Sequence, residues 1–464
     1  MHTHFVGIGG YGMSALAELV HRRGGQVSGC DARPNQRSAR LAGLGVAVAE
    51  GHDVAHLRDV DRLVYNTDVP ADLPERALAP GQGVRVVHRS ELLAEALQGA
   101  FAVAVTGTHG KTTTTALITH LLTEAGLDPT GIVGGEVDAW GGGLRLGRAD
   151  LVVAEADESD ASFLRYHPHV AVVTNVEPEH LEHYGGSFAR VVEAYERFVG
   201  GMAEGGRAVI WAGDPSAARL AAAARARGAA RLYGEEPKAD IRALDVGAEN
   251  GAMAFRVARD GVDLGPVRLS LPGRHNVHNA LAAVEASLLA GAAFERLAPA
   301  LGRFANAHRR FEILYSGDDG RVVDDYAHHP SEIRAELAAA RLLNPGRVCA
   351  VFQPQRYTRT KNLWDGFLTA FDDADEVMLL DVYAPAGEAP LPGVSGAALA
   401  RELGARRRGV RYAPSLEAAE EMSAASWRTG DLWLFMGAGD VWRAAHALAR
   451  HAARRAGATP AGEG

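Results

Sequence analysis

AVTGTHGKTTTTALITHLL, residues 104 to 122, is the stretch that decides the fold. An apolar run ends at Val105, a short loop with glycines at 107 and 110 follows, and a helical pattern begins at Lys111. Glycines let such a loop turn tightly and point backbone N–H groups inward, and the lysine brings positive charge to phosphate oxygens. The helix adds the positive end of its dipole. Although Val105 stands where the general phosphate-loop pattern has its first glycine, strand, loop and helix in this order predict a nucleoside triphosphate site.

Four consecutive threonines, Thr112–Thr115, open this helix although threonine is a mediocre helix former. The hydroxyl of Thr112 can reach a magnesium ion that is held by the phosphates. For the other three threonines two interpretations stay open. Their hydroxyls face phosphate or the loop backbone, or they serve only local capping and packing.

The composition is that of an ordinary globular protein. The 464 residues are 47% hydrophobic and 23% charged, and the net charge is −9, so no basic field attracts nucleic acid or anionic lipid. Two distant cysteines, Cys30 and Cys349, argue for a reducing compartment and against a disulfide scaffold. The N-terminus lacks a signal-peptide pattern, and no apolar run approaches the roughly 20 residues of a membrane span. We therefore expect a cytoplasmic protein with no membrane or nucleic-acid partner.

Short apolar strands alternate with helical segments along the chain. Most of them are apolar at consecutive positions, which is typical of parallel strands covered on both faces, so the expected fold class is α/β. The polar stretch 234–261 predicts antiparallel strands at a sheet edge, and the Ala/Arg-rich segment 217–232 predicts a surface helix. The clearest expected strands are His4–Ile8, Phe101–Val105, Leu151–Ala154, Val170–Thr174, Ala208–Trp211, Val322–Val323, Val348–Phe352, Val377–Leu380 and Leu432–Met436.

The length suits about three domains of roughly 150 residues each. We expect a Rossmann-like N-terminal domain over residues 1–98 and a central P-loop-type domain with a mostly parallel sheet over 99–308. A Rossmann-like C-terminal domain would cover 309–450, and 451–464 would be a disordered tail.

Acidic side chains and histidines follow two of the expected strands. EADESD begins with Glu155, and NVEPEHLEHYGG contains His180 and His183. A hard cation that bridges phosphates needs a few carboxylate oxygens, and Glu155 is the first choice because it comes directly after its strand. A structural zinc site at the two histidines is disfavoured, since no cysteine lies nearby and the spacing is not HExxH. A solvated acidic loop would not explain why the groups cluster at two strand ends.

A second glycine loop, GIGGYG, follows the first expected strand. Gly7, Gly9 and Gly12 match the GxGxxG pattern, and Asp31 follows a second short strand. Alone, this is a fingerprint typical of NAD binding. The physical requirement is only a diphosphate at a helix N-terminus, so the diphosphate need not belong to NAD.

Charged loops also follow two strands of the third section. One loop, VVDDYAHHPSE, contains His328, and the other, VFQPQRYTRTKN, contains Arg356, Arg359 and Lys361. A basic cluster in a strand-end loop suits a carboxylate or a phosphate. A salt network at a domain interface is the alternative interpretation.

Taken together and in this order, the motifs resemble the Mur ligase family over nearly the whole chain. No single motif decides the matter, but the ordered set is highly specific. The matching segments are HFVGIGGYGMSALAEL, TGTHGKTTTT, EADESDASFL, VVTNVEPEHLEHYGG, LPGRHNVHNALAA, RRFE, DDYAHHPSEI, FQPQRYTRT and GAGDV.

The resemblance implies binding roles for individual residues. The nucleotide sugar would bind to the first domain at Gly9, Gly10, Gly12, Met13 and Asp31. ATP would bind at Thr106, Gly107, Thr108, His109, Gly110, Lys111, Thr112, Thr113, His275, Asn276, Asn279 and Arg310. Magnesium would be held by Thr112, Glu155 and His180. The catalytic residues would be Lys111, Glu155, His180, His328, Arg356 and Arg359.

The implied activity is an ATP-dependent ligation in peptidoglycan precursor synthesis. L-Alanine would be joined to the lactyl carboxylate of UDP-N-acetylmuramate through an acyl phosphate, by a monomer or weak homodimer. Several family members carry a carbamoylated lysine soon after the metal histidine, and the stretch 181–200 contains no lysine, which favours the alanine-adding branch. The stretch Tyr65–Pro70 is less serine-rich than this branch leads us to expect, so the local sugar contacts stay open.

Three alternatives are carried forward. A ligase that adds a preformed peptide to the same nucleotide sugar would differ in its amino substrate. An NAD-dependent oxidoreductase would leave TGTHGKTTT unexplained. A nucleotide-binding switch protein would have no need of charged strand-end clusters in separate domains.

Overall fold

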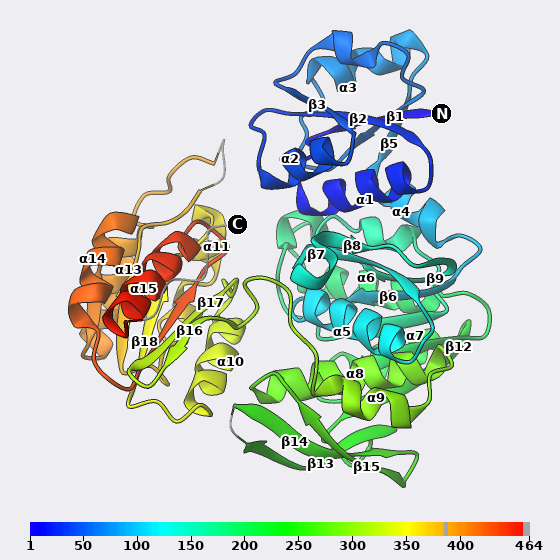
Figure 1. The fold of residues 1–464 in the computed structure, drawn as a ribbon. Helices are drawn as coiled ribbons and strands as arrows, with labels where there is room; N and C mark the ends of the chain where they lie inside the picture. The colour runs from blue at the N-terminus through cyan, green and yellow to red at the C-terminus, as the bar shows by residue number, and fades with distance from the viewer. Residues whose placement is uncertain (250, 385–387, 458–464) are drawn as a thin grey trace. The chain divides into compact units, whose positions relative to one another are not determined.

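The computed structural model describes residues 1–249, 251–384 and 388–457, which form three β-sheets with helices packed against them (Figure 1). The chain divides into two compact units. The first unit contains residues 1–247, 254–269 and 277–307 and carries the first two sheets. The second unit contains residues 248–253 and 270–276 together with the chain from His308 onward, and it carries the third sheet.

The first sheet is parallel and has the strand order β3-β2-β1-β4-β5, which is the order of a Rossmann-like domain. Its direction of winding reverses between β1 and β4, and this switch point lies beside the glycine loop that follows β1. The strands are β1 (His2–Val6), β2 (Gln26–Asp31), β3 (Ala47–Glu50), β4 (Arg62–Tyr65) and β5 (Arg85–His88). The helices are α1 (Tyr11–Arg22), α2 (Gln36–Gly43), α3 (Pro74–Leu78) and α4 (Arg89–Leu97), with 3-10 turns η1 (Val54–Leu57) and η2 (Ala79–Gln82).

The second sheet has the order β15-β14-β13-β12-β11-β10-β6-β9-β7-β8 and is parallel from β13 through β7. Its strands are β6 (Phe101–Thr106), β7 (Pro129–Val137), β8 (Gly142–Arg145), β9 (Arg148–Glu155), β10 (Val170–Val173), β11 (Gly206–Trp211), β12 (Gly228–Gly234), β13 (Ile241–Glu249), β14 (Ala252–Arg259) and β15 (Val262–Leu269). The helices are α5 (Lys111–Glu124), α6 (Phe188–Gly200), α7 (Ala217–Ala224), α8 (Arg274–Leu289) and α9 (Phe294–Leu301), with 3-10 turns η3 (Asp138–Trp140), η4 (Ser162–Arg165) and η5 (Leu181–Tyr184).

The third sheet has the order β16-β17-β21-β18-β19-β20, and only its edge pair β16–β17 is antiparallel among the described strands. Its strands are β16 (Glu312–Gly317), β17 (Gly320–Asp325), β18 (Arg347–Phe352), β19 (Glu376–Leu379), β20 (Val410–Tyr412) and β21 (Asp431–Met436). The helices are α10 (Pro330–Arg341), α11 (Tyr357–Asn362), α12 (Trp364–Phe367), α13 (Gly396–Arg406), α14 (Leu416–Ser426) and α15 (Trp442–Arg455).

The α/β fold class expected from consecutive apolar positions is confirmed. Every residue of β10 is buried, as are five of the six residues of β6, because helices cover both faces of these central strands. The polar stretch does form edge strands, since the two-residue connection between β14 and β15 allows only antiparallel pairing. Among the described helices, none is both long and apolar enough to cross a lipid bilayer.

Two local expectations are wrong. The Ala/Arg-rich segment 217–232 is helical only over α7, and its second half enters β12, which pairs in parallel with β11. Gly228 sits against the backbone of Gly206 so closely that a Cβ would clash, so the pairing of two glycines permits this approach. The expectation of a disordered tail from residue 451 is wrong for residues 451–455, because α15 continues to Arg455 and Ala452 packs in the core of the third sheet. Residues 458–464 lie outside the described part.

Candidate active site

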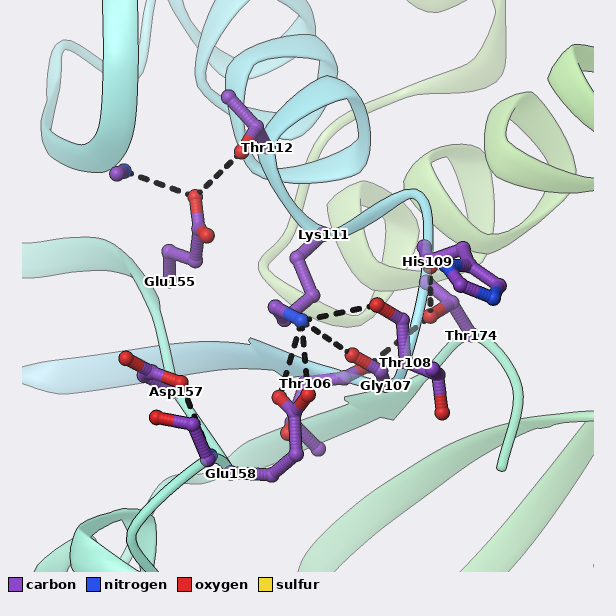
Figure 2. Close-up of polar contacts among 12 residues, drawn as sticks. Thr106, Gly107, Thr108, His109, Lys111, Thr112, Glu155, Asp157, Glu158 and Thr174 are labelled. Atoms are coloured by element: carbon purple, nitrogen blue, oxygen red, sulfur yellow. Dashed lines mark hydrogen bonds and ion pairs between the residues drawn. The ribbon is translucent and has the colours of Figure 1, made fainter. Parts of the chain in front are cut away.

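The phosphate-type loop lies between the buried strand β6 and the helix α5, at the centre of the second sheet (Figure 2). Gly110 is the N-cap of α5 with φ 79°, a left-handed conformation that glycine adopts without strain. At Gly107 (φ 137°) a Cβ would collide with the Thr174 hydroxyl, so only glycine fits there. The loop is therefore shaped by two glycines and leaves the first N–H groups of α5 facing outward.

The end of β10 holds this loop in place. The Asn175 side chain accepts a hydrogen bond from the His109 N–H (2.9 Å) and donates one to the His109 carbonyl (3.1 Å). The Thr174 hydroxyl donates to the same carbonyl (2.6 Å), and the Glu177 N–H donates to the Thr108 hydroxyl (2.8 Å). Sequence reasoning did not single out Thr174 as a site residue, and only its place directly after a buried strand could have indicated it.

Lys111 is held by the loop and by a buried carboxylate. Its Nζ donates to the carbonyls of Gly107 (2.6 Å) and Thr108 (3.1 Å) and lies 3.0 Å from Glu158 Oε1 (Figure 2). Burial opposes the charge on Lys111, but Glu158, Asp157 and Glu155 outweigh it and raise the lysine pKa above its usual range. Lys111 is thus a cation held next to the phosphate loop. The sequence did not predict Glu158 as its ion-pair partner.

Glu158 itself is a buried carboxylate with a raised pKa. It is 4% exposed, and burial, reinforced by the charge of Asp157 and opposed by Lys111, raises its pKa to about 7. Burial would also raise the pKa of Asp157, but Arg89 and Lys111 hold it well below its usual range. Two neighbouring acids therefore differ in charge near neutral pH.

Thr112 and Glu155 meet beside the first turn of α5. The Thr112 hydroxyl donates to Glu155 Oε2 (2.9 Å), and the same oxygen accepts the Gly134 N–H (2.8 Å) (Figure 2). The Thr115 hydroxyl donates to the Lys111 carbonyl (2.8 Å), so the local-packing interpretation holds for this threonine. Thr106, Thr113 and Thr114 are buried.

His180 lies in the loop after β10, where it precedes η5. Its φ of 53° is a left-handed conformation that a non-glycine residue rarely adopts, and its Nδ1 lies 3.8 Å from Glu182 Oε1. The strand β9, which ends at Glu155, and the strand β10, which precedes the loop with His180, lie on opposite sides of β6 in the sheet.

The first glycine loop is held by side chains from the end of β2 and from the residues that follow it. Asp31 accepts the Gly9 N–H (3.0 Å), and the Gly9 carbonyl accepts hydrogen bonds from Asn35 (3.1 Å) and Arg37 (2.6 Å). Asp31 therefore supports the loop itself. Arg37 also pairs with Glu136 of the central sheet (2.9 Å). Sequence reasoning missed Asn35 and Arg37.

Helix α1 starts directly at this loop. Gly10 is its N-cap and has no side chain to cap the helix, while Met13 is buried in the core of the first unit. A Cβ on Gly12 would lie 3.5 Å from Arg89, which itself binds Asp157 (2.7 Å). An ion pair thus connects the surroundings of the first glycine loop with the acidic loop after β9.

The expected adenine-site residues lie along α8. Within the first unit, a Cβ on Gly110 would come within 2.7 Å of Asn279 Oδ1, so Asn279 lies against the phosphate loop. Within the second unit, the Asn276 amide donates to the Pro272 carbonyl (2.7 Å), and His275 Nε2 lies 3.4 Å from Glu336.

Arginines of the second unit surround β17. Arg309 donates to Asp324 (2.9 Å), and the guanidinium of Arg310 lies 5.1 Å from the ring centroid of Tyr326. Burial raises the pKa of Asp324 to about 6 although Arg309 opposes it. His328 Nδ1 lies 3.0 Å from the Tyr326 carbonyl.

Arg356 and Arg359 lie around the start of α11. Arg356 has φ 63° and its N–H donates to the Tyr383 carbonyl (2.9 Å), while Arg359 donates to Gln355 (2.5 Å). A left-handed arginine costs free energy that the surroundings must supply, and such residues cluster at functional sites. This conformation of Arg356 is consistent with the functional role predicted for the loop that carries Arg356 and Arg359.

Family models match the three sheets in order. The Mur ligase family catalytic domain matches residues 2–100, the Mur ligase middle domain matches 105–287, and the Mur ligase glutamate ligase domain matches 309–439. The chain belongs to the Mur ligase family. The resemblance that the ordered motifs carry is therefore confirmed.

Individual Mur ligases resemble the chain over nearly its full length. The UDP-N-acetylmuramate–L-alanine ligase of Symbiobacterium thermophilum is 50% identical over 459 residues, 98% of this chain and 95% of the relative. The crystal structure of UDP-N-acetylmuramate–alanine ligase from Thermotoga maritima superimposes with a TM-score of 0.82 at 29% identity, covering 98% and 99% of the chains. A murein peptide ligase from Psychrobacter arcticus shares the fold, with a TM-score of 0.70 at 24% identity and 96% and 99% coverage.

Proposed function

We propose that the chain joins L-alanine to the lactyl carboxylate of UDP-N-acetylmuramate with hydrolysis of ATP to ADP and phosphate, in peptidoglycan precursor synthesis. The observation that carries this proposal is the pinned phosphate loop with Lys111, together with 50% identity to a ligase of this name over 98% of the chain. An NAD-dependent oxidoreductase is the weaker candidate, because a redox step would not use this phosphate loop.

The reaction has two steps. A carboxylate oxygen of UDP-N-acetylmuramate attacks the γ-phosphorus of ATP, and ADP leaves. The amine of L-alanine then attacks the carbon of the resulting acyl phosphate, and inorganic phosphate leaves as the amide forms. A carboxylate is a poor electrophile, so phosphorylation supplies the leaving group.

Lys111 and the loop N–H groups are assigned to the phosphates. Lys111 neutralises charge that builds up on the γ-phosphate during transfer, while the N–H groups at the start of α5 bind the other phosphate oxygens. Without ATP, the Lys111 ammonium group donates a hydrogen bond to Glu158. Phosphate oxygens of ATP would take the place of this carboxylate as acceptors. The protein otherwise positions the reactants.

Thr112 and Glu155 fit a magnesium ion. Both offer hard oxygen atoms, and their separation of 2.9 Å equals the spacing of neighbouring ligands in an octahedron with metal–oxygen bonds of about 2.05 Å. His180, on the other flank of β6, is assigned to the same metal-binding region. Magnesium there would offset the charge of the triphosphate.

The remaining assignments concern the substrate-carrying parts. Three domains, residues 1–98, 99–308 and 309–450, are proposed to bind the nucleotide sugar, to bind ATP and to complete the site. The sugar diphosphate is assigned to Gly9, Gly10 and Gly12 at the N-terminus of α1, which carries positive partial charge. His328, Arg356 and Arg359 are assigned to the reacting groups, and His275, Asn276, Asn279 and Arg310 to ATP.

A ligase that adds a preformed peptide is the second candidate within the family. The Psychrobacter arcticus peptide ligase has lower identity than both alanine ligases above and a lower TM-score than the Thermotoga maritima structure. The amino substrate therefore separates the two proposals.

Measuring phosphate release with each substrate omitted in turn tests the proposed function. We expect release only when ATP, UDP-N-acetylmuramate and L-alanine are all present, with one phosphate per amide. Release that depends on a tripeptide and not on L-alanine would identify a peptide ligase. Release from ATP alone at the full rate would contradict a ligase and favour a nucleotide switch.

A further inference from the structure

The outer face of the first sheet, opposite α1, carries a cluster of potential metal ligands that the proposed reaction does not use. His4 lies on β1, Cys30 on β2, His52 in the turn after β3, His56 in η1 and Glu75 in α3 (Figure 1). These five segments are separate in sequence and meet around the buried thiol of Cys30. The cluster lies beside the small apolar core that contains Val6 and Leu63, on the side of the sheet facing away from α1.

Three ligand atoms form a nearly equilateral triangle. Sγ of Cys30 lies 3.4 Å from Nδ1 of His52 and 3.3 Å from Oε1 of Glu75, and these last two atoms are 3.4 Å apart. A tetrahedral zinc ion with ordinary bond lengths separates its sulfur, nitrogen and oxygen ligands by roughly 3.4 to 3.6 Å. The three atoms thus already have the spacing of three corners of such a site.

A fourth ligand is within reach. Nδ1 of His56 lies 3.1 Å from the same Glu75 oxygen, and one ligand atom each of His4, Cys30 and His56 lie within 4.8 Å of one another. The rings of His4 and His56 stack with their centroids 5.7 Å apart. His56 can therefore be the fourth ligand, and the stacked ring of His4 holds the His56 ring in place.

Unpartnered buried atoms separate this cluster from an ordinary hydrogen-bond network. Glu75 Oε2 and His4 Nε2 are buried and have no hydrogen-bond partner among the described residues, and their residues are 0% and 2% exposed. A buried polar atom without a partner costs free energy. Glu75 Oε2 is the second oxygen of a proposed ligand, so a cation bound to this carboxylate would recover part of that cost.

We propose that Cys30, His52, His56 and Glu75 bind a zinc-class divalent transition-metal ion. A thiolate with two imidazoles and a carboxylate suits such an ion and does not suit magnesium or calcium. On binding, a metal–sulfur bond forms and the thiol proton is released to solvent. The thiolate and the carboxylate then balance the two positive charges. The rings of His52 and His56, each 21% exposed, offer the entry path.

The metal would stiffen the strand that supports the first glycine loop. The Cys30 carbonyl accepts the N–H groups of Gly7 (2.8 Å) and Ile8 (3.1 Å), and the next residue, Asp31, holds Gly9. The ion would also connect β2 with η1 and α3. Binding is therefore expected to raise the melting temperature of the full chain.

Cobalt titration of the chelator-treated full chain in excess magnesium tests this site. We expect one equivalent of Co²⁺ to produce a thiolate-to-cobalt charge-transfer band and the visible bands of tetrahedral cobalt, and Zn²⁺ to abolish both. An ion held by Thr112, Glu155 and His180 would have no sulfur ligand and would give no thiolate band. Cys30→Ser should lose the band, and His52→Ala, which keeps the thiol, should weaken binding at least about tenfold.

Matched controls use residues outside the cluster. Cys349→Ser removes the other buried thiol, and His21→Ala removes a histidine of α1, and both should leave the band and the affinity unchanged. Cobalt binding without a thiolate band, unchanged affinity in a folded His52→Ala variant, or no tight binding by the wild type would overturn the proposal. Each outcome is read without ligase activity, so it is independent of the proposed function.

Discussion

Lys111 is the residue on which the proposed chemistry depends most, because its ammonium group is already fixed 3.0 Å from Glu158 and 2.6 Å from the Gly107 carbonyl. Replacing it with alanine removes the charge that stabilises the transferring phosphoryl group. We expect Lys111→Ala to lower kcat/KM for ATP at least about 100-fold. Affinity for UDP-N-acetylmuramate should stay unchanged, because the nucleotide sugar is assigned to the first glycine loop.

Steady-state kinetics and calorimetric titration of the nucleotide sugar check this pair of expectations. Lys238→Ala is the matched control, since Lys238 is an exposed lysine of the same unit. An equal loss of nucleotide-sugar affinity in Lys111→Ala would contradict the assignment of two separate sites.

Glu158 gives a pH-dependent contribution to stability whose sign follows from its raised pKa. Its folded-state pKa of about 7 exceeds the ordinary value of 4.5, so the protonated form is favoured by folding. This contribution is complete below about pH 4.5 and is lost as the pH rises through 7. Glu158→Gln cannot ionise, so the free energy of unfolding of the variant relative to wild type should rise by about 1 to 3 kcal/mol between pH 4.5 and 8.

Urea denaturation of both proteins across this pH range measures the difference. The glutamine can still accept a hydrogen bond from Lys111, which keeps the shape of the site. Parallel stability curves for the two proteins would show that Glu158 titrates normally in the folded protein.

At the scale of elements, β9, which ends at Glu155, and β10, which precedes the loop with His180, lie on opposite sides of β6 in the sheet. We expect Glu155→Gln to raise the magnesium concentration needed for half-maximal activity about tenfold or more, because an amide oxygen carries no charge for the metal. His180→Ala should shift it in the same direction. Magnesium titrations of the initial rate provide the measurement.

Asp150→Asn supplies the control, since Asp150 lies near the other end of β9, is exposed and pairs with Arg148. The metal assignment is wrong if Glu155→Gln and Asp150→Asn show the same magnesium dependence as the wild type.

Sequence reasoning reached the central elements because their signals are local. Consecutive apolar residues marked β6 and β10, and glycines marked the loop between β6 and α5. The strand β12 was missed because Ala and Arg favour helix, and its pairing with β11 depends on partners distant in sequence. Helix α7 ends at Ala224 although Arg225, Ala226 and Arg227 also favour helix, so tertiary packing and not propensity sets this boundary.

Contacts of site residues were harder to foresee than the residues themselves. EADESD marked an acidic loop, but which acid binds Lys111 and which one binds Thr112 depends on how the chain turns after β9. Asp31 matches a cofactor fingerprint, but that pattern did not predict that its carboxylate accepts the Gly9 N–H. The ion pair Arg89–Asp157 joins segments 68 residues apart in sequence, so no local sequence pattern predicts it.

At the scale of the whole molecule, the ligase reaction requires a γ-phosphate, a carboxylate and an amine to react in order. The glycine loop at the start of α1 and the phosphate loop at the start of α5 belong to different sheets of the first unit. A nucleotide sugar and ATP can therefore bind at the same time, and the carboxylate can be phosphorylated before the amine reacts.

The most direct test of this order is to supply hydroxylamine in place of L-alanine. With ATP, magnesium and UDP-N-acetylmuramate present, an acyl phosphate should be trapped as the hydroxamate of the nucleotide sugar, with one ADP released per hydroxamate. Absence of the hydroxamate under conditions where L-alanine turns over would contradict the acyl-phosphate route. Equal ADP release without UDP-N-acetylmuramate would contradict the ligase itself, since water would then be the acceptor of the phosphoryl group.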